Sequence, residues 1–512
     1  MSARPLTIEH LSVTYGNGFR GVSDISFTMD HGERLAVVGA SGSGKSTLVR
    51  AIIGLLPPTA VVTGRILVGD DDVTVMSDRE RRRLDGRVIG YVAQDPFAAF
   101  DPLRRVRHHV REAWAAHERT VSESDIDIGL ERMGIPEPNQ RTRQRPHQWS
   151  GGMLQRATTL AATVHDPILT LADEPTSALD TEFADIAVEL LRSTCSALLL
   201  VTHDLALAGR HTENTVVLHE GRMIEQAPSS MVLARPRHEI TRALIRAASP
   251  TPRPTPGSTL GSTPGSTPGS TPGSTPAVDA SGSIVVSADN VTKSYAGHGR
   301  RMHAVYDTSL EVRSGEVVGI IGPSGSGKST LLRLLTGIER PDGGVVFADG
   351  TPMWDSGATP NLPRKGFAMP IFQDPVGSLD TRWPLWRSIT EPLVLSGTPM
   401  NRRERRDRAE AALASVGMHD IGVDRLPGSL SVGQCQRVAV VRGLIAGPAI
   451  LAADEPTASL DVEAAAVVSD MLRGAADGGA AVVVVSHDEA RVRSYADRVL
   501  LMRNGCVQEE TR

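Results

Sequence analysis

Two nine-residue segments of the chain combine glycines, a lysine and hydroxyl side chains in one order. They read GASGSGKST from Gly39 to Thr47 and GPSGSGKST from Gly322 to Thr330. Glycines let a backbone curl so that successive N–H groups face an anion, and a following helix presents its positive N-terminus. Both segments therefore predict phosphate loops of the G-x-x-x-x-G-K-[ST] type. A mere glycine-rich turn is disfavoured because lysine is scarce, the lysines being Lys45, Lys293, Lys328 and Lys365.

In each loop we expect the lysine to reach the β- and γ-phosphates of ATP, and Ser46 or Ser329 to bind Mg²⁺ through its hydroxyl. The loops contribute the predicted ATP contacts Gly39, Ala40, Ser41, Gly42, Ser43, Gly44, Lys45, Ser46, Thr47, Gly322, Pro323, Ser324, Gly325, Ser326, Gly327, Lys328, Ser329 and Thr330. ATP and Mg²⁺ are therefore the predicted cofactors.

A carboxylate pair follows a second apolar run in each half of the chain. Asp173 and Glu174 come after residues 168–172, and Asp454 and Glu455 come after residues 449–453. In a protein with a phosphate loop, an aspartate at the end of a buried strand is placed to hold Mg²⁺ through its water shell, and the next glutamate can orient the attacking water. Taken alone, either pair would be read as a helix N-cap. Because a phosphate loop is present in each half, we predict instead that the aspartates bind Mg²⁺ and that the glutamates act in hydrolysis.

Uninterrupted apolar runs precede these groups. Arg34–Val38 and Val317–Ile321 lead into the two loops, and helical patterns follow at 47–55 and 330–335. A further run at 197–201, with its counterpart at 481–485, ends just before a His-Asp pair. Apolar strands that alternate with helices indicate a parallel sheet covered on both faces, which is an α/β fold.

The same landmarks recur at nearly one spacing along the chain. Lys45 matches Lys328 at an offset of 283 residues, and His203 matches His487 at an offset of 284. Such a repeat indicates a duplicated domain and not a solenoid. Between the copies, Pro, Gly, Ser and Thr dominate. The composition predicts a first domain at 1–248, a flexible linker at 249–283 and a second domain at 284–512.

The composition limits the function classes. The 512 residues carry a formal net charge of -5, so no basic excess is available for nucleic acid. Cys195, Cys435 and Cys506 are too few and too far apart for a metal clip or a disulfide framework, which favours a reducing cytoplasm. The chain contains no run of 18 apolar residues and no signal-peptide pattern, so we expect no membrane span in it.

With these motifs, both halves resemble the nucleotide-binding domains of the ABC (ATP-binding cassette) superfamily. The resemblance implies two tandem P-loop NTPase domains, each with a parallel-sheet core, a small antiparallel β subdomain and a helical subdomain. It also implies roles for further residues. Tyr15 and Tyr295 would stack on adenine, Gln94 and Gln373 would sense Mg²⁺ and contact the membrane partner, and His203 and His487 would lie near the γ-phosphate. The segments SALD at 177–180 and ASLD at 458–461 resemble the loop that crosses the dimer interface.

The family signature L-S-G-G-Q appears in altered form in both halves. The first copy keeps Ser150, Gly151 and Gly152, whereas the second reads Ser431, Val432, Gly433 and Gln434. In the family this segment presents a helix N-terminus to the γ-phosphate held by the opposite domain. A β-branched side chain at 432 is expected to resist close approach of the backbone to phosphate, although harmless drift is an equally good interpretation.

The segments after the two glutamines resemble the Q-D-P-x-x-S-L-[DN]-P pattern of ATPases that drive peptide and nickel importers. They read QDPFAAFDP from Gln94 and QDPVGSLD from Gln373, and residues 235–250 are similar to the segment that closes one subunit type of that group. The resemblance implies an ATP-hydrolysing fusion of two subunits that forms an internal pseudo-dimer. Its partners would be two integral-membrane permeases and, through them, an extracytoplasmic solute-binding protein. The protein would then be peripheral, at the cytoplasmic face of the cell membrane, with peptide or nickel as cargo.

Two other classes share the core motifs. Twin-cassette translation factors that act on the ribosome have a long, charged and helical segment between their cassettes, whereas residues 249–283 are neutral and predicted to be flexible. The Q-D-P pattern argues against ABC exporters and vitamin importers, which also share the core motifs. Both classes remain as alternatives to a peptide or nickel importer.

Overall fold

The computed structural model describes residues 4–40, 42–117, 120–176, 181–248, 282–297, 300–323, 325–355, 357, 359–458, 460 and 462–509. The chain divides into two compact units, residues 1–248 and 249–512. Ser41, Ser324, the loop at 177–180 and nearly all of the linker expected at 249–283 lie outside the described residues. Among the described helices, none is both long and apolar enough to cross a membrane.

The first unit contains two sheets. One has four strands in the order β2-β1-β4-β5 and is antiparallel. The other has six strands in the order β10-β9-β3-β8-β7-β6, and only β10 runs antiparallel to its neighbour. The strands are β1 (Leu6–Thr14), β2 (Arg20–Met29), β3 (Arg34–Val38), β4 (Val61–Val68), β5 (Asp71–Asp72), β6 (Ile89–Val92), β7 (Leu169–Asp173), β8 (Leu198–Thr202), β9 (Asn214–His219) and β10 (Arg222–Pro228).

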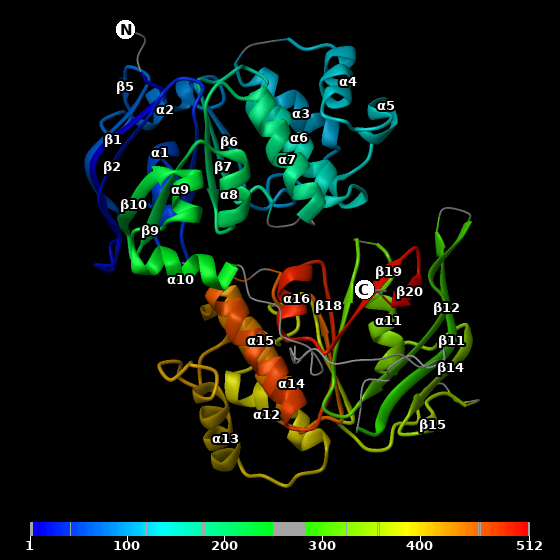
Figure 1. Cartoon of the computed structure of the whole chain (residues 1–512). Coiled ribbons are helices and arrows are strands. Elements are labelled where there is room, and N and C mark those ends of the chain that lie inside the picture. Colours follow the sequence, from blue (N-terminus) through cyan, green and yellow to red (C-terminus); the bar gives the residue numbers. More distant parts are fainter. Residues whose placement is uncertain are drawn as a thin grey trace, which may run out of the picture. The chain divides into compact units, whose positions relative to one another are not determined.

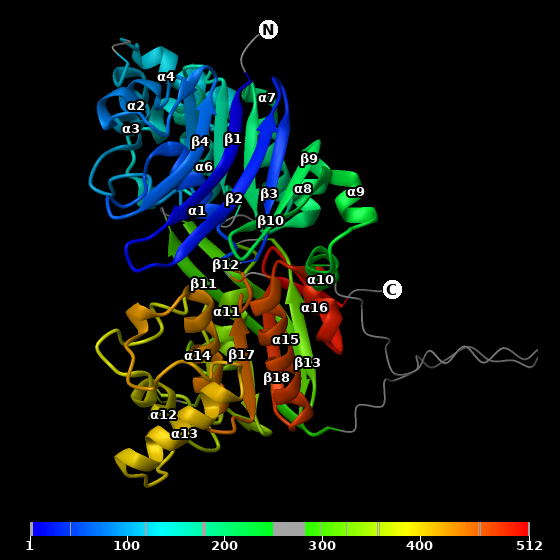
Figure 2. The same ribbon diagram turned by 90° about the vertical axis from the view of Figure 1, so that its left-hand side faces the viewer.

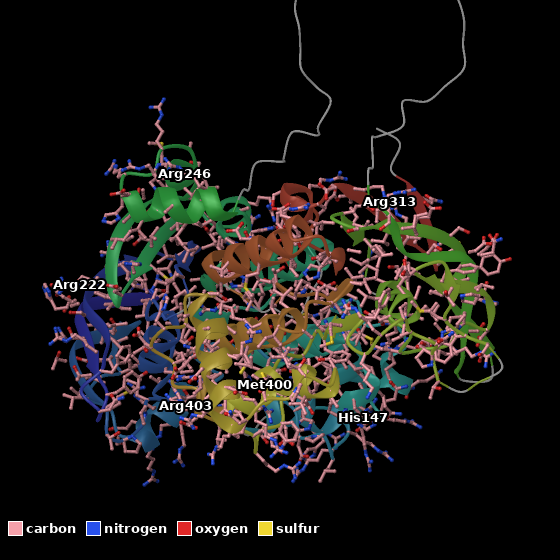
Figure 3. The ribbon with its side chains drawn as sticks, turned by 90° about the horizontal axis from the view of Figure 1, so that it is seen from below. His147, Arg222, Arg246, Arg313, Met400 and Arg403 are labelled. Carbon is pink, nitrogen blue, oxygen red and sulfur yellow. The ribbon has the colours of Figure 1, made fainter. Side chains whose placement is uncertain are left out.

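Helices cover both faces of the parallel strands in this unit. They are α1 (Lys45–Ile53), α2 (Asp78–Leu84), α3 (Val106–Ala115), α4 (Glu123–Arg132), α5 (Pro138–Arg141), α6 (Gly151–Thr163), α7 (Thr181–Thr194), α8 (Leu205–His211), α9 (Ser229–Ala234) and α10 (Glu239–Ala248). Leu48 and Ile52 of α1 join one apolar core with residues of both sheets, such as Ile8 and Leu35. In Figure 1 the antiparallel sheet and helices α3 to α5 lie at opposite ends of this unit, and Figure 3 labels Arg222 at the start of β10 and Arg246 on α10.

The second unit repeats this architecture. Its antiparallel sheet has the order β12-β11-β14-β15, and its six-stranded sheet has the order β16-β17-β18-β13-β19-β20 with only β20 antiparallel. The strands are β11 (Ile284–Gly297), β12 (Arg300–Arg313), β13 (Val317–Ile321), β14 (Gly343–Ala348), β15 (Thr351–Pro352), β16 (Ala368–Ile371), β17 (Ile450–Asp454), β18 (Ala481–Ser486), β19 (Arg498–Arg503) and β20 (Cys506–Glu509). The helices are α11 (Lys328–Leu335), α12 (Leu385–Leu395), α13 (Arg402–Ala414), α14 (Val432–Leu444), α15 (Val462–Asp477) and α16 (Glu489–Tyr495).

Each unit is therefore an α/β domain with a mostly parallel sheet, a small antiparallel sheet and a helical part, as predicted (Figures 1 and 2). The runs Arg34–Val38 and Val317–Ile321 are strands with the predicted bounds. The helices after the phosphate loops begin at Lys45 and Lys328, two residues earlier than predicted, because a glycine in the left-handed conformation, Gly44 or Gly327, is the N-cap of each.

Candidate ATP-binding and hydrolysis sites

The predicted site residues of each unit follow the carboxyl ends of neighbouring parallel strands. In the first unit the phosphate loop follows β3, Asp173 ends β7, and His203 follows β8, while these three strands lie in the order β3-β8-β7. The carboxyl ends of parallel strands meet at one edge of a sheet, where α/β proteins bind their ligands. The equivalent strands of the second unit, β13, β18 and β17, bring Asp454 and His487 to the same edge as its loop.

The phosphate loops depend on glycine for their shape. Gly44 has a φ of 102° and Gly327 a φ of 105°, values that L side chains rarely adopt. A Cβ atom at Gly44 would also lie 2.6 Å from the carbonyl oxygen of Gly21. The spacing of the glycines is therefore required by the backbone, and the loop conformation points N–H groups and the N-terminus of α1 or α11 toward one place.

The two motif lysines fold back over their own loops. Nζ of Lys45 donates to the carbonyl oxygens of Gly39 and Ala40 at 2.7 and 2.9 Å. Nζ of Lys328 donates to Gly322 and Pro323 in the same way, at 2.7 and 3.0 Å. Each lysine thus holds its positive charge at the loop, where a phosphate would bind. Ser43 and Ser326 add buried hydroxyls that have no hydrogen-bond partner among the described residues, so the loops fit a polyphosphate.

The expected magnesium ligands supply oxygen atoms, which Mg²⁺ prefers. Ser329 donates a hydrogen bond from Oγ to Oδ1 of Asp454 at 2.9 Å, so the two groups lie together at the site. Burial, with the neighbouring charge of Glu174, raises the pKa of Asp173 to about 6. Burial also raises the pKa of Asp454. A buried carboxylate that is costly to ionise in the free protein is well suited to a cation, because a divalent ion would offset that cost.

The two candidate hydrolytic glutamates have an unusual backbone. Glu174 has a φ of 44° and Glu455 a φ of 48°, in the left-handed region that side chains other than glycine seldom adopt. Their N–H groups still extend the sheet, since Glu174 donates to Val201 at 2.8 Å and Glu455 to Val485 at 2.9 Å. Backbone strain of this kind is concentrated at functional sites, where the surrounding structure holds it in place.

In the first unit, the glutamine and histidine predicted from the family both contact the glutamate. Gln94 donates from Nε2 to Oε2 of Glu174 at 2.9 Å, and Nδ1 of His203 lies 3.4 Å from Oε1. Burial alone would raise the pKa of Glu174, but His203 and Lys45 together hold it below its usual range. Glu174 is therefore an ionised carboxylate with two oriented neighbours, which can accept a hydrogen bond from a water molecule.

The second unit keeps one of these two contacts. Nδ1 of His487 lies 2.9 Å from Oε2 of Glu455, and Glu455 is mostly buried. Gln373 is exposed, and among the described residues it makes no hydrogen bond to Glu455 like that of Gln94 to Glu174. The aspartates after both histidines, Asp204 and Asp488, are helix N-caps, so each His-Asp pair combines a local structural role with a site residue.

The two tyrosines predicted to stack on adenine lie beside the helices that follow the phosphate loops. The Tyr15 hydroxyl is 3.0 Å from Oγ1 of Thr47, and its ring stacks on Phe19. Tyr295 is 40% exposed, and its hydroxyl donates to Oε2 of Glu339 at 2.6 Å. Tyr15 is partly buried, and Tyr295 is the more exposed of the two tyrosines.

The signature segments form helix N-termini in both units. Ser150 is the N-cap of α6, and its hydroxyl accepts a hydrogen bond from Met153 N. Ser431 is the N-cap of α14, and it shares a capping box with Gln434. Gly151 and Val432 are the first residues of these helices. Valine therefore leaves the helix start intact, but its side chain is 44% exposed there.

Comparison with known proteins identifies the family. The model of a family described as ABC transporter matches residues 22–177 and again residues 305–458. The chain belongs to the ABC transporter family. Its two units are ABC cassettes, which bind and hydrolyse ATP, so this chain is an ABC transporter ATPase. Sequence reasoning therefore identified the family and the fold class correctly.

Two bacterial relatives match the two-cassette chain over nearly all of its length. The peptidoglycan transport ATP-binding protein YejF of Agrobacterium fabrum is 31% identical over 98% of this chain and 92% of its own. The oligopeptide transport ATP-binding protein OppD of Mycobacterium tuberculosis is 30% identical over 99% of this chain and 94% of its own. The solved structure of RNase-L Inhibitor has a TM-score of 0.62 at 21% identity, covering 98% of this chain and 90% of its own, and so shares the fold.

Sequence reasoning did not find several residues that support the site. The sequence predicted Thr47 as a phosphate-loop residue but not as a partner of the Tyr15 hydroxyl. It did not predict Glu339, which accepts a hydrogen bond from the Tyr295 hydroxyl. The sequence assigned no role to Lys293, whose Nζ lies 3.5 Å from Oε1 of Glu339. Its position two residues before Tyr295, where the first cassette has an apolar Val13, was the available signal.

Proposed function

We propose that this ABC ATPase powers the import of short peptides or peptide-like solutes through two membrane permeases. The observation that carries the proposal is the match to relatives named for oligopeptide and peptidoglycan transport, which extends over both cassettes in one chain. The Q-D-P segments after Gln94 and Gln373 are in keeping with the same importer group. Import of nickel or another metal complex is the second candidate, and it rests on those segments alone.

The site residues have the roles expected from their positions. Lys45 and Lys328 hold the β- and γ-phosphates, and Tyr15 and Tyr295 face the adenine. Ser46, Asp173 and Gln94 in the first cassette would hold Mg²⁺, as would Ser329, Asp454 and Gln373 in the second. Bound there, Mg²⁺ would neutralise charge on the β- and γ-phosphates.

The glutamates carry the hydrolytic step in this proposal. Glu174 and Glu455 each accept a hydrogen bond from the attacking water, and the histidines His203 and His487 keep the carboxylates oriented. Support comes from the contacts of His203 and Gln94 with Glu174 and of His487 with Glu455. Because the side chains are prearranged, little reorganisation is needed when ATP binds.

The two cassettes work as an internal pseudo-dimer, in which the signature helix of one completes the ATP site of the other. ATP favours the closed pair, hydrolysis releases it, and the difference in affinity drives the permeases. The protein acts at the cytoplasmic face of the cell membrane, with an extracytoplasmic solute-binding protein that delivers cargo to the permeases. Residues 249–283 act as a tether that keeps the cassettes together.

The test is cargo uptake by the source strain with the gene deleted. The deletion should abolish uptake of a radiolabelled tripeptide, and the wild-type gene should restore it while a Lys45→Ala/Lys328→Ala gene should not. Uptake of labelled nickel, measured in parallel, should be unchanged. Loss of nickel uptake with normal peptide uptake would replace peptide by nickel as the cargo, and normal uptake of both with defective ribosome recycling would support a translation factor.

A further inference from the structure

The two tyrosines next to the phosphate loops have different hydroxyl partners. The Tyr15 hydroxyl meets Oγ1 of Thr47. Tyr295 interacts with the equivalent Thr330 but also donates to the carboxylate of Glu339 at 2.6 Å. The second cassette therefore adds a charged acceptor that fixes the outer end of the tyrosine ring.

Glu339 is itself held by a lysine. Nζ of Lys293 lies 3.5 Å from Oε1 of Glu339 and 3.2 Å from Oδ1 of Asp342, and it donates to the Arg340 carbonyl oxygen at 2.7 Å. The side chains of Lys293 and Glu339 are only 14% and 21% exposed, so their attraction is weakened by water less than that of a surface pair. The lysine thus fixes the carboxylate that accepts the tyrosine hydroxyl.

The same network reaches the backbone beside the tyrosine. Oδ2 of Asp342 accepts a hydrogen bond at 2.9 Å from the backbone N–H of Ser294, the residue before Tyr295. Tyr295 is consequently anchored at both ends, through the adjoining backbone and through its hydroxyl. Burial and the carboxylate of Glu339 raise the pKa of Tyr295, so the hydroxyl remains a donor.

The first cassette has apolar residues at the positions of this ion pair. Val13 precedes Tyr15 by two residues, as Lys293 precedes Tyr295. Leu56 follows Gly54 (φ of 72°) by two residues, as Glu339 follows Gly337 (φ of 71°). Val13 is buried in the apolar core of this unit, and Leu56 packs against that core. The positions that carry the ion pair beside Tyr295 are therefore apolar beside Tyr15.

We infer that Lys293 and Glu339 are positioning residues for the base of the nucleotide in the second cassette, acting through Tyr295. They fix the plane of the ring before ATP arrives, so less conformational freedom is lost on binding. The inference rests on the proposed function, because it takes Tyr295 as the residue that stacks on adenine. It adds that adenine affinity depends on a charge network in one cassette and on apolar packing in the other.

The experiment compares ATP with inorganic triphosphate, which has phosphates but no base. Binding of each is measured by calorimetry on the full chain carrying Lys45→Ala. This substitution weakens binding at the first cassette, so the measured affinity is that of the second cassette. Glu339→Gln should weaken ATP binding about three- to tenfold, because the charged acceptor of the Tyr295 hydroxyl is replaced by a neutral and weaker one. Triphosphate binding should not change, and in steady-state assays KM should rise while kcat at saturating ATP is retained.

A double-mutant cycle tests whether the effect passes through the tyrosine. With Tyr295→Phe, which keeps the ring and removes the hydroxyl, Glu339→Gln should cause no further loss of ATP affinity. Lys293→Arg, which keeps the charge, should retain most of the affinity. Leu56→Gln, at the matching position of the first cassette, is the control and should leave this binding unchanged.

Four outcomes would overturn the inference. Equal losses for ATP and triphosphate would show that the network supports the phosphate loop and not the base. Additive losses in the cycle would show that Glu339 does not act through Tyr295. If Tyr295→Ala weakens ATP binding while Glu339→Gln has no effect, this inference fails and the proposed role of Tyr295 stands. If Tyr295→Ala has no effect on ATP binding, that proposed role fails as well.

Discussion

Gln94 donates a hydrogen bond to Glu174 at 2.9 Å, joining two residues 80 positions apart in the sequence. Gln94 follows β6 and Glu174 follows β7, and these two strands are adjacent in the sheet, so the two side chains meet at its edge. Whatever contacts Gln94 from outside the cassette can therefore act directly on the candidate catalytic carboxylate.

We predict that Gln94→Leu lowers turnover at the first site, measured in a Glu455→Gln background, by a larger factor than Gln373→Leu lowers turnover at the second site, measured in a Glu174→Gln background. Loss of a hydrogen bond to a charged group costs about 1.5–3 kcal/mol, which corresponds to roughly a tenfold or larger fall in kcat at the first site. Turnover should be measured at saturating ATP on the purified chain, with Gln373→Leu as the matched variant. Equal effects of the two substitutions would mean that the bond to Glu174 does not contribute to hydrolysis.

Lys45→Ala combined with Lys328→Ala should abolish ATP hydrolysis, a loss of at least about a hundredfold, because both compact charges at the phosphate loops are removed. Phosphate release under excess ATP is the measurement. Lys365→Ala is the control, since this exposed lysine lies outside both loops. Wild-type turnover in the folded double variant would contradict the assignment of both sites.

The two proposed composite sites should differ in rate. Val432 exposes a branched side chain at the start of α14, where Gly151 begins α6 without one. In the pseudo-dimer, the site with Glu174 receives the helix that starts at Val432, and a displaced donor at the γ-phosphate can cost about 3 kcal/mol. Glu455→Gln should therefore reduce turnover more than Glu174→Gln, and Val432→Gly should increase it.

Strong coupling between the sites can make either glutamate variant inactive, so Val432→Gly provides the independent measurement. Turnover should be compared at saturating ATP in the assembled transporter, with nucleotide binding checked separately. If Glu174→Gln is the more damaging change and Val432→Gly adds no activity, then the asymmetry has the opposite sense.

Glu225 should stabilise the end of the first unit. Its carboxylate accepts hydrogen bonds from the backbone N–H groups of Arg237 and His238, at 2.9 and 3.1 Å, and so connects β10 to the segment just before α10. Glu225→Leu leaves both donors without this partner, which should lower the free energy of unfolding by about 1–3 kcal/mol. Hydrogen exchange at the two amides should accelerate, whereas Glu220→Gln, in an exposed turn, should change neither quantity.

The contribution of Glu225 should also depend on pH. Burial would raise its pKa, but the hydrogen bonds from the backbone N–H groups of Arg237 and His238, with other nearby polar groups, outweigh burial and hold the pKa below its ordinary value of 4.5. A carboxyl with a lowered folded-state pKa contributes stability that is complete above the unfolded value and is lost as the pH falls through the folded value. The stability difference between wild type and Glu225→Gln should therefore shrink in acid, below about pH 4. A constant difference across this range would contradict the role of the charge.

Local sequence patterns predicted the strands and loops well because they depend on nearby residues. The apolar runs before each phosphate loop matched β3 and β13, since uninterrupted Val, Ile and Leu identify a buried parallel strand. The starts of α1 and α11 were placed two residues late because the pattern of apolar residues does not show that a left-handed glycine caps the helix.

Contacts between distant residues could not be predicted in this way. The bond from Gln94 to Glu174 depends on strand order, which a single sequence does not give. Duplicated motifs also hid differences between the cassettes. Tyr15 and Tyr295 occupy matching positions in the sequence, but their hydroxyls have different partners. The Tyr15 hydroxyl contacts Thr47, and the Tyr295 hydroxyl donates to Glu339. The two tyrosines therefore predicted one role for both cassettes, but they did not show that different residues hold each tyrosine in place.

The left-handed backbone at Glu174 and Glu455 lowers the stability of the fold, although the glutamate side chains are proposed to be needed for ATP hydrolysis. Glycine adopts that conformation without the steric cost that a glutamate bears, about 1 kcal/mol or more per site. A library selected for heat resistance alone would accumulate glycine at both positions and lose its ATPase activity. Any engineering of this chain for robustness must therefore exclude positions 174 and 455, where a gain in melting temperature would report damage and not improvement.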